Sequence, residues 1–265
     1  PEALAGAELV LVCVKSGDTA AAAEAIAAHA PADALVVSLQ NGLANAEALA
    51  RALGPGRVVP GMVAFNVVRE GPGRYAQTTE GAVMVGAEAA DLARRLDGPL
   101  VAAEAREDIE AIQRSKLLMN LNNALCLLSG LSLRDELRSR PWRRMLAACV
   151  AEGIAVAKAE GATLARLGKV HPKIVPFVLR LPDPLFVRAA AAMLKVDPAA
   201  RTSMVDDYES GRPSEIAYLN GHVAARGRAL GLKTPVNARV TAAVEAAFAD
   251  PARPPLAHDP ARLLA

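Results

Sequence analysis

The stretch ELVLVCVKSGDTAAAAEAIAAHAPADALVVSLQNG, residues 8–42, decides the fold of the first part of the chain. It opens with a short apolar run at 8–14, rich in β-branched residues, which predicts a strand buried on both faces. An alanine-rich segment follows at 19–29, with Asp18 placed to cap it, and predicts a helix. A second apolar run at 34–42 predicts another strand. Strand, helix and strand with short connections indicate parallel pairing through a crossover helix.

The same alternation continues beyond this stretch. A helix is predicted at 45–53, ending at the Gly-Pro-Gly turn 54–56, and a third buried strand is predicted at 57–65. From 66 to 86, turns rich in glycine and proline separate short β-prone pieces, which favours a few additional antiparallel edge strands. The first part of the chain is therefore expected to be an α/β domain with a parallel sheet.

From about Glu104 onward the pattern becomes helical almost throughout. Helices are predicted at 106–128, 132–138, 141–161, 172–180, 183–194, 213–230 and 236–248. The proline-rich residues 251–265 are expected to be a loosely held tail. We therefore predict two domains, an α/β domain at 1–103 and an all-helical domain at 104–265.

Composition argues against several classes of function. A net charge of +2 with both signs interspersed, and only 3% aromatic residues, argue against nucleic acid and anionic membranes as partners. No apolar run reaches the ~20 residues of a membrane span, and no secretory signal pattern is evident. Cys13, Cys126 and Cys149 lie far apart among apolar neighbours, as inert core thiols do, and show no metal-ligand spacing. We expect a cytoplasmic protein without a metal site.

Polar residues follow the first two predicted strands. Lys15 comes just after the first strand, and Gln40, Asn41 and Gly42 come just after the second. Taken singly, a solvated loop lysine and an ordinary turn are the simpler interpretations. Because ligands bind outside the carboxyl ends of strands in open parallel sheets, however, the two loops together predict one ligand crevice.

The helix-like stretch RSKLLMNLNNAL, residues 114–125, carries polar residues at unusual positions. Lys116, Asn120 and Asn123 are separated by four and three residues, so they share one stripe of a helix whose other directions hold leucines. A solvent-facing edge is the alternative interpretation, but such edges usually carry Glu, Lys and Arg. The stripe therefore favours the wall of a polar cleft.

A third polar stretch lies at 202–237. Glu215 follows Pro213 and Ser214 at an expected helix start, where a capping carboxylate is the alternative to a functional one. Ser203 likewise has a local role open to it. Together with Lys116, these groups suit the reduction of a carbonyl, because an ammonium group can stabilise and protonate the oxygen on which charge develops. Spacing does not select reduction over hydrolysis, but no nucleophile triad or metal cluster competes.

These stretches together resemble the ketopantoate reductase (2-dehydropantoate 2-reductase) family over nearly the whole chain. The resemblance is carried by VCVKSGDT at 12–19, SLQNG at 38–42, KLLMNLNNAL at 116–125, and TSM at 202–204 followed by GRPSEIAYLNG at 211–221 and GLKTPVN at 231–237. It implies a Rossmann-type dinucleotide-binding domain joined to a helical substrate-binding and dimerisation domain. It also implies NADPH-dependent reduction of 2-dehydropantoate to pantoate, on the pathway to coenzyme A.

The resemblance also implies roles for individual residues. Lys116 matches the general acid, and Glu215 matches the glutamate that engages the substrate and the lysine. Asn120 and Ser203 match substrate-binding positions, and Asn41 matches a residue at both cofactor and substrate. Lys15, Gln40 and Gly42 are expected on the cofactor side of the cleft. A homodimer through the helical half is compatible with its apolar faces.

The sequence departs from the family pattern in three places. Ala124 and Ala200 stand where members of the family can carry polar substrate contacts, which leaves open a reductase of another 2-oxo acid. No G-x-G-x-x-G segment precedes a helix in this chain, which opens on Pro1 in mid-pattern and is expected to be a piece of a longer protein. Taken alone it is expected to bind cofactor poorly, so a non-catalytic binding or dimerisation module is a further alternative. The choice of NADPH over NADH rests on the resemblance.

Overall fold

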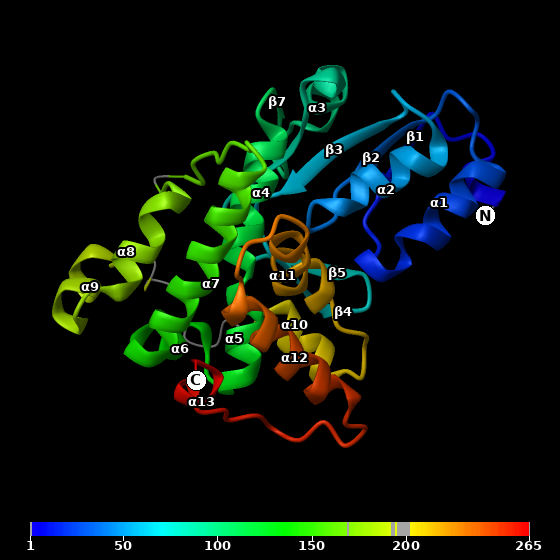
Figure 1. Ribbon diagram of the computed structural model, residues 1–265. Coiled ribbons are helices and arrows are strands. Elements are labelled where there is room, and N and C mark those ends of the chain that lie inside the picture. The colour runs from blue at the N-terminus through cyan, green and yellow to red at the C-terminus, as the bar shows by residue number, and fades with distance from the viewer. Residues whose placement is uncertain (1, 169, 192–193, 195–201, 265) are drawn as a thin grey trace. The chain divides into compact units, whose positions relative to one another are not determined.

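The computed structural model describes residues 2–168, 170–191, 194 and 202–264. The chain divides into two compact units, one ending at Gln113 and one starting at Arg114; Figure 1 colours them along the chain. The division lies inside helix α4 (Ile109–Asn120). The expected division between 103 and 104 falls within strand β7 (Ala102–Arg106), whose alanines and charged residues read locally as helix formers. Pairing with a neighbouring strand overrides that local preference.

The first unit contains a five-stranded sheet in the order β1-β2-β3-β6-β7. Strands β1 (Leu9–Val12), β2 (Leu35–Ser38) and β3 (Val58–Val63) pair in parallel. Strand β6 (Ala82–Gly86) pairs antiparallel to β3 and parallel to β7. The predicted α/β class with a mainly parallel sheet is therefore confirmed.

Helices cover both faces of this sheet (Figure 1). Helices α1 (Thr19–His29) and α2 (Ala44–Leu53) pack with Val36 on one face, while α3 (Ala90–Leu96) packs with Val37 on the other. Successive side chains of a strand point to opposite faces, so two adjacent valines of β2 serve two different cores. Helix α1 has the predicted bounds, and α2 begins one residue early.

Strand β1 corrects one prediction. It pairs only with β2 among the described residues and so forms an edge of the sheet. Leu11 is consequently 42% exposed, whereas the central strand β2 is buried on both sides. A run of β-branched residues does not by itself distinguish an edge strand from a central one, because the difference lies in the neighbours.

The segment after β3 contains antiparallel pairs, as expected, but it adds no edge strand to the five-stranded sheet, because β6 lies between β3 and β7. Strands β4 (Val67–Gly71) and β5 (Arg74–Gln77) make a separate two-stranded hairpin. The short 3₁₀ helices of this unit are η1 (Glu2–Leu4), η2 (Ser16–Asp18) and η3 (Ala87–Ala89).

The second unit is helical, as expected, and is built around the long helix α7 (Arg140–Ala159). The other elements are α5 (Asn122–Ser129), α6 (Leu133–Arg138), η4 (Pro172–Ile174), α8 (Val175–Arg180), α9 (Asp183–Ala189), α10 (Ser203–Glu209), η5 (Ile216–Tyr218), α11 (Asn220–Ala229), α12 (Pro235–Ala249) and α13 (Pro260–Leu264). Helix α7 contacts α6, α8, α11 and α12. Its inward face is apolar over most of its length.

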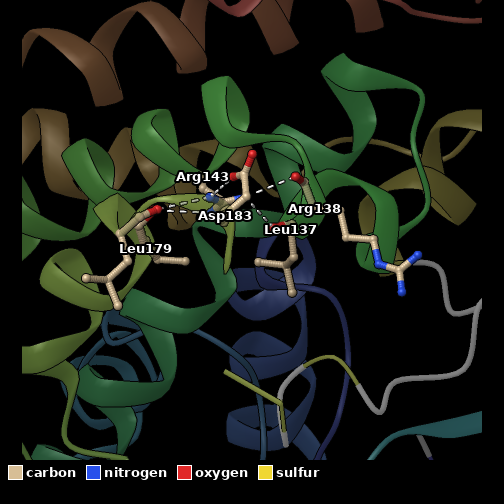
Figure 2. Close-up of polar contacts among 6 residues, drawn as sticks. Leu137, Arg138, Arg143, Leu179 and Asp183 are labelled. Carbon is tan, nitrogen blue, oxygen red and sulfur yellow. Dashed lines mark hydrogen bonds and ion pairs between the residues drawn. The ribbon is translucent and has the colours of Figure 1, made fainter. Parts of the chain in front are cut away.

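A buried arginine of α7 joins four helices of this unit (Figure 2). Arg143 is fully buried, and its Nη1 donates to the carbonyl oxygens of Leu137 and Arg138 at 3.2 and 3.0 Å. Its Nε donates to the Leu179 carbonyl oxygen at 3.3 Å, and its Nη2 donates to Asp183 Oδ1 at 2.6 Å. Because a buried guanidinium is tolerated only when its donors are paired, this residue holds α6, α8 and α9 in place on α7.

Two predicted helices are interrupted. The helix expected at 106–128 is two helices that meet at Leu121, next to asparagines that compete for backbone hydrogen bonds. The helix expected at 213–230 begins only as η5, and the backbone breaks again at Leu219, with ψ −102°. Helix α9 ends at Ala189, short of the expected 194; residues 192 and 193 lie outside the described ones. Helices α3, α10 and α13 were not predicted.

The expected loose tail is anchored, which corrects another prediction. Tyr208 Oη donates to the Pro254 carbonyl oxygen at 3.0 Å, and the His258 amide donates to the Leu128 carbonyl oxygen at 2.8 Å. A proline-rich composition reports only that the segment is not a helix, whereas its attachment depends on partners elsewhere in the chain. Among the described residues, no helix has the length and apolar character needed to cross a membrane.

Candidate functional site

In the first unit, the candidate residues lie at the carboxyl ends of the adjacent parallel strands β1 and β2. Lys15 is exposed and leads into η2, and Asn41 is exposed after β2. Gly42 has φ 89°, a backbone conformation that other residues rarely adopt, and so lets the chain turn into α2. This is the position at which open parallel sheets bind ligands.

The side chain of Gln40 braces these loops from within. It is buried, and its Nε2 donates to the Val14 carbonyl oxygen at 3.0 Å and to Thr19 Oγ1 at 2.8 Å. Its Oε1 accepts from Ser38 Oγ at 3.1 Å. Both amide hydrogens and the amide oxygen are therefore used inside the protein. The expected cofactor contact of Gln40 stays a prediction, while its bracing of the β1 and β2 loops is plain.

A second buried amide, which the sequence did not single out, completes this network. Asn45 Oδ1 accepts from Thr19 Oγ1 at 3.0 Å, and its Nδ2 donates to Ser16 Oγ at 3.1 Å and to the Asn41 carbonyl oxygen at 2.7 Å. The two loops are thus tied to each other and to the start of α2. The available signal was an asparagine in the first turn of a helix that follows a strand directly.

In the second unit, α4 carries Lys116 in partly buried surroundings. Its neighbour Ser115 is buried and donates from Oγ to the Ala165 carbonyl oxygen at 2.8 Å, and Leu117 and Leu118 are buried as well. Burial lowers the pKa of the Lys116 ammonium group to about 8, because the charged form loses hydration. Asn120 lies one turn further, as the last residue of the helix.

Helix α4 approaches α11 closely at a glycine of α7. A Cβ atom at Gly153 would collide with Leu118 Cδ2 and would lie 3.7 Å from Val223 Cγ2 of α11. The absence of a side chain at this position therefore lets three helices meet. Glu215 precedes η5, which packs on α11. Lys116 thus lies on the helix that meets α7 and α11 at this glycine, whereas Glu215 precedes a 3₁₀ helix that packs on α11.

Ser203 is exposed as the first residue of α10. The preceding Thr202 donates from Oγ1 to the Asn123 carbonyl oxygen at 3.4 Å, and α10 packs on α5. The start of α10 is thereby attached to the corner where α4 ends and α5 begins. Asn120 and Ser203 both belong to this corner of the helical unit.

Two other asparagines of the family-like motifs have a structural role. Asn220 and Asn237 are fully buried, and Asn220 Nδ2 donates to Asn237 Oδ1 at 3.1 Å. The carboxylate of Glu152 accepts from the amides of Val236 and Asn237 at 2.9 Å and from Asn237 Nδ2 at 2.7 Å. We call the cluster of Glu152, Asn220 and Asn237 the α7–α11–α12 junction.

The two alanine departures have different outcomes. Ala124 is fully buried in α5, within the core of the helical unit. A polar side chain at this position would therefore start from the core of the helical unit. Ala200 lies outside the described residues. Asn122 is also buried, and its Nδ2 lies 3.7 Å from Cys126 Sγ.

The cysteines are free thiols, two of them as expected. Cys126 and Cys149 are buried, and burial raises the pKa of both thiols. Cys13 is exposed, contrary to expectation, because it lies beyond the end of the edge strand β1. Among the described residues, no group of three or more His, Cys, Asp or Glu side chains could hold a metal ion.

Comparison with known families now bears on this geometry. Residues 1–90 match the family described as "Ketopantoate reductase PanE/ApbA", and residues 108–247 match "Ketopantoate reductase PanE/ApbA C terminal". A 2-dehydropantoate 2-reductase of Caulobacter vibrioides is 31% identical over 252 residues, which cover 93% of this chain and 80% of that protein. One of Halobacterium salinarum is 28% identical, covering 89% of this chain and 74% of that protein.

Solved structures give the same result. A PanE/ApbA family ketopantoate reductase of Ralstonia eutropha JMP134 matches with a TM-score of 0.78 and 32% identity, over 93% of this chain and 77% of that one. A D-mandelate dehydrogenase with NADH and anilino(oxo)acetate matches with a TM-score of 0.74 at 22% identity, over 90% of this chain and 75% of that one, and shares the fold. The α/β unit, the helical unit and these relatives define an oxidoreductase. The chain belongs to the ketopantoate reductase family.

Proposed function

We propose that the protein reduces the 2-oxo group of 2-dehydropantoate to the alcohol of pantoate, with NADPH, in the pathway to pantothenate and coenzyme A. The observation that carries the proposal is Lys116, an amine held in a partly buried helical position with its pKa lowered to about 8. A lysine so placed remains mainly protonated at neutral pH, yet gives up its proton more readily than a solvated lysine.

The residues at the ends of strands β1 and β2 carry side chains of the types that bind a dinucleotide. The exposed Lys15 offers a cation for a phosphate group, and the exposed Asn41 offers an amide for polar groups. The buried Gln40 and Asn45 hold these two loops in fixed positions, which favours a ligand that touches both. NADPH supplies the hydride that carbonyl reduction requires.

Lys116 acts on the substrate oxygen in this proposal. As the carbonyl carbon is reduced, negative charge develops on its oxygen, and the ammonium group of Lys116 stabilises that charge. Lys116 then donates its proton to the oxygen and completes the alcohol. Water regenerates the ammonium group after the product leaves.

Three further residues position the substrate. Glu215 orients the substrate hydroxyl and the ammonium group of Lys116, a role supported by the resemblance of its GRPSEIAYLNG motif to that of the family. Asn120 and Ser203, at the α4–α5 corner, offer an amide and a hydroxyl to the polar groups of the 2-oxo acid. Positioning of this kind lowers the entropic cost of reaching the reactive geometry.

Steady-state kinetics test the proposal directly. Purified protein is assayed with 2-dehydropantoate, pyruvate and 2-oxoisovalerate, each with NADPH and with NADH, by following nicotinamide absorbance. We expect the highest kcat/KM for 2-dehydropantoate with NADPH. Equal kcat/KM for the three acids would favour a reductase of another 2-oxo acid, and an absence of turnover with all of them would favour the non-catalytic module.

We also propose a homodimer formed by the helical unit. Support comes from exposed apolar side chains on α8 and α9, with Phe177 at 70%, Leu185 at 55% and Val187 at 51% exposure. Light scattering after size-exclusion chromatography measures the mass, and a monomer at micromolar concentration would contradict this proposal.

A further inference from the structure

The helical unit contains a cavity of about 530 Å³ that none of the candidate site residues lines. Its walls are the end of α5, the following loop to α6, one face of α10 and the anchored tail. Most of the lining is apolar, and Leu127, Leu131, Val205 and Leu256 contribute to it. Volumes of this size and character are typical of sites for small molecules.

A single arginine gives this cavity a fixed positive group. Arg253 lines the cavity, and its Nη1 donates to the carbonyl oxygens of Asp207, Tyr208 and Arg212 at 2.9–3.2 Å. Its guanidinium carbon also lies 5.6 Å from the centre of the Tyr208 ring and 4.9 Å from that of Phe248. These contacts hold the guanidinium in one orientation.

The other edge of the Arg253 guanidinium carries N–H donors that are not used within the described part of the protein. Nε and Nη2 of Arg253 donate to no acceptor among the described residues, and these two nitrogens form the side-on fork that binds a carboxylate through two parallel hydrogen bonds. The Arg253 backbone is left-handed, with φ 42°, which is uncommon for a residue other than glycine. The tail therefore holds a costly backbone conformation at the residue whose side chain lines the cavity.

The tail wall is itself held tightly against α5. At Gly130 an added Cβ atom would collide with the Leu256 carbonyl oxygen, so only glycine permits this approach. The His258 amide then anchors the next turn of the tail on Leu128. The cavity is consequently bounded by fixed backbone on two sides.

We propose that this cavity is a second ligand site, which takes a small apolar monocarboxylic acid. The hydrocarbon part lies against Leu127, Val205 and Leu256, and the carboxylate accepts hydrogen bonds from Nε and Nη2 of Arg253. An apolar body with one acidic end matches the mainly apolar lining and its oriented guanidinium; the other charged lining residue, Glu209, is exposed to solvent. The proposal does not depend on the identity of the reductase substrate.

Isothermal titration calorimetry with butanoate, hexanoate and octanoate tests the apolar part. Burial of a CH₂ group contributes about 0.8 kcal/mol, so each added CH₂ should tighten binding about fourfold. Octanol, which keeps the chain and lacks the charge, should bind at least about tenfold more weakly than octanoate because the two charge-assisted hydrogen bonds are lost. Equal binding of octanol and octanoate would overturn the role of Arg253.

Two cavity-filling variants locate the site. Val205→Phe narrows the cavity from the α10 side, and Leu131→Trp fills it from the exposed rim, so one serves if the other fails to fold. Each should weaken octanoate binding at least about tenfold with reductase turnover unchanged. Lys116→Ala should leave octanoate binding unchanged. Loss of octanoate binding in Lys116→Ala with retention in both filled variants would place the acid in the reductase site and overturn the proposal, as would no binding to the unmodified protein.

Discussion

The end of helix α4 and the α7–α11–α12 junction both place polar side chains among apolar helices, but they satisfy them differently. At the junction, the carboxylate of the partly buried Glu152 accepts three N–H groups, and the fully buried Asn220 donates to the fully buried Asn237. At the end of α4, Lys116 and Asn120 are only partly buried, and burial lowers the pKa of the lysine to about 8.

We propose that this difference separates residues that stabilise the fold from residues that take part in the reaction. A buried polar group with geometrically good partners rigidifies the structure, and removing one partner leaves the others unsatisfied. A charge that is partly desolvated costs stability but gains reactivity. Substitutions at the end of α4 should therefore lower activity more than stability, and substitutions at the junction should lower stability more than activity.

Lys116→Ala is expected to have the largest effect. Loss of the proton donor should lower kcat by about 10²–10⁴-fold, while the Kd for NADPH changes little. The folded protein should be as stable as the unmodified one or more so, because a costly partly buried charge is removed. Steady-state kinetics and thermal unfolding measure the two quantities. Lys158→Ala, an exposed lysine on α7, is the matched control, and equal turnover in both variants would refute the assignment.

Asn237→Ala tests the other region. It removes the partner of Asn220 and one donor to Glu152, so the free energy of unfolding should fall by about 2–4 kcal/mol. The kcat of the molecules that remain folded should stay close to normal. Urea unfolding gives the free energy, and Glu245→Ala, on the exposed face of the same helix, is the control with an expected change below about 0.5 kcal/mol. A loss of kcat without a loss of stability would place Asn237 in the reactive region instead.

The pH profile sharpens the account of Lys116. The acid must be protonated to act, so kcat/KM for reduction should be level below the pKa of about 8 and fall about tenfold per pH unit above it. In Lys116→Arg the residual activity should lack this decline, because an arginine remains protonated throughout. A decline that persists unchanged in the arginine variant would assign it to a different group.

Glu136→Gln has the smallest expected effect, a change in stability. It tests a buried carboxyl group that resembles neither the end of α4 nor the α7–α11–α12 junction. Glu136 is fully buried, neither of its oxygens has a normal hydrogen bond among the described residues, and burial raises its pKa to about 7, with Asn122 and Arg143 offsetting this only in part. The folded pKa lies above the unfolded one, so the protonated carboxyl is favoured in the fold, and stability is lost as pH rises from about 4.5 through 7.

Glutamine stays neutral and can donate to Asn122 Oδ1, which also lacks a partner among the described residues. The variant should therefore gain at least about 1 kcal/mol over the unmodified protein at pH 8 and nothing at pH 4.5. Thermal unfolding at both pH values measures the difference. A gain that is the same at both would remove the explanation through ionisation.

Much of the fold could be predicted from local pattern. The bounds of α1 follow from an alanine-rich run that ends at a proline-containing turn, although the side chain of Asp18 makes no capping hydrogen bond. The helical character of the second unit follows from its periodicity. The break at Leu121, the edge position of β1 and the anchored tail could not be predicted. Each depends on which distant segment supplies a hydrogen-bond partner or leaves one side of a strand uncovered.

The positions of several candidate residues could be predicted in part, while their roles stay predictions. Lys15, Asn41 and Lys116 were singled out from their places at strand ends and on an apolar helix, and the structure shows them exposed or partly buried there. The internal hydrogen bonds of the Gln40 amide could not be predicted. Its partners Thr19 and Ser38 carry no distinctive local pattern, and they reach Gln40 only when the two loops meet in the fold. Asn45, which joins the loops, carried only the weak signal of an asparagine in the first turn of a helix.

Periodicity and motif spacing are local properties of the chain, and they were enough to predict the α/β class of the first unit, the helical class of the second and the family. Only the tertiary structure shows which polar residues are paired inside the protein and which are partly exposed. That distinction rests on burial and on partners far away in sequence. Burial lowers the pKa of Lys116, the Glu152 carboxylate pairs with three N–H groups of the junction, and the folding of the tail places Arg253 in the wall of a cavity.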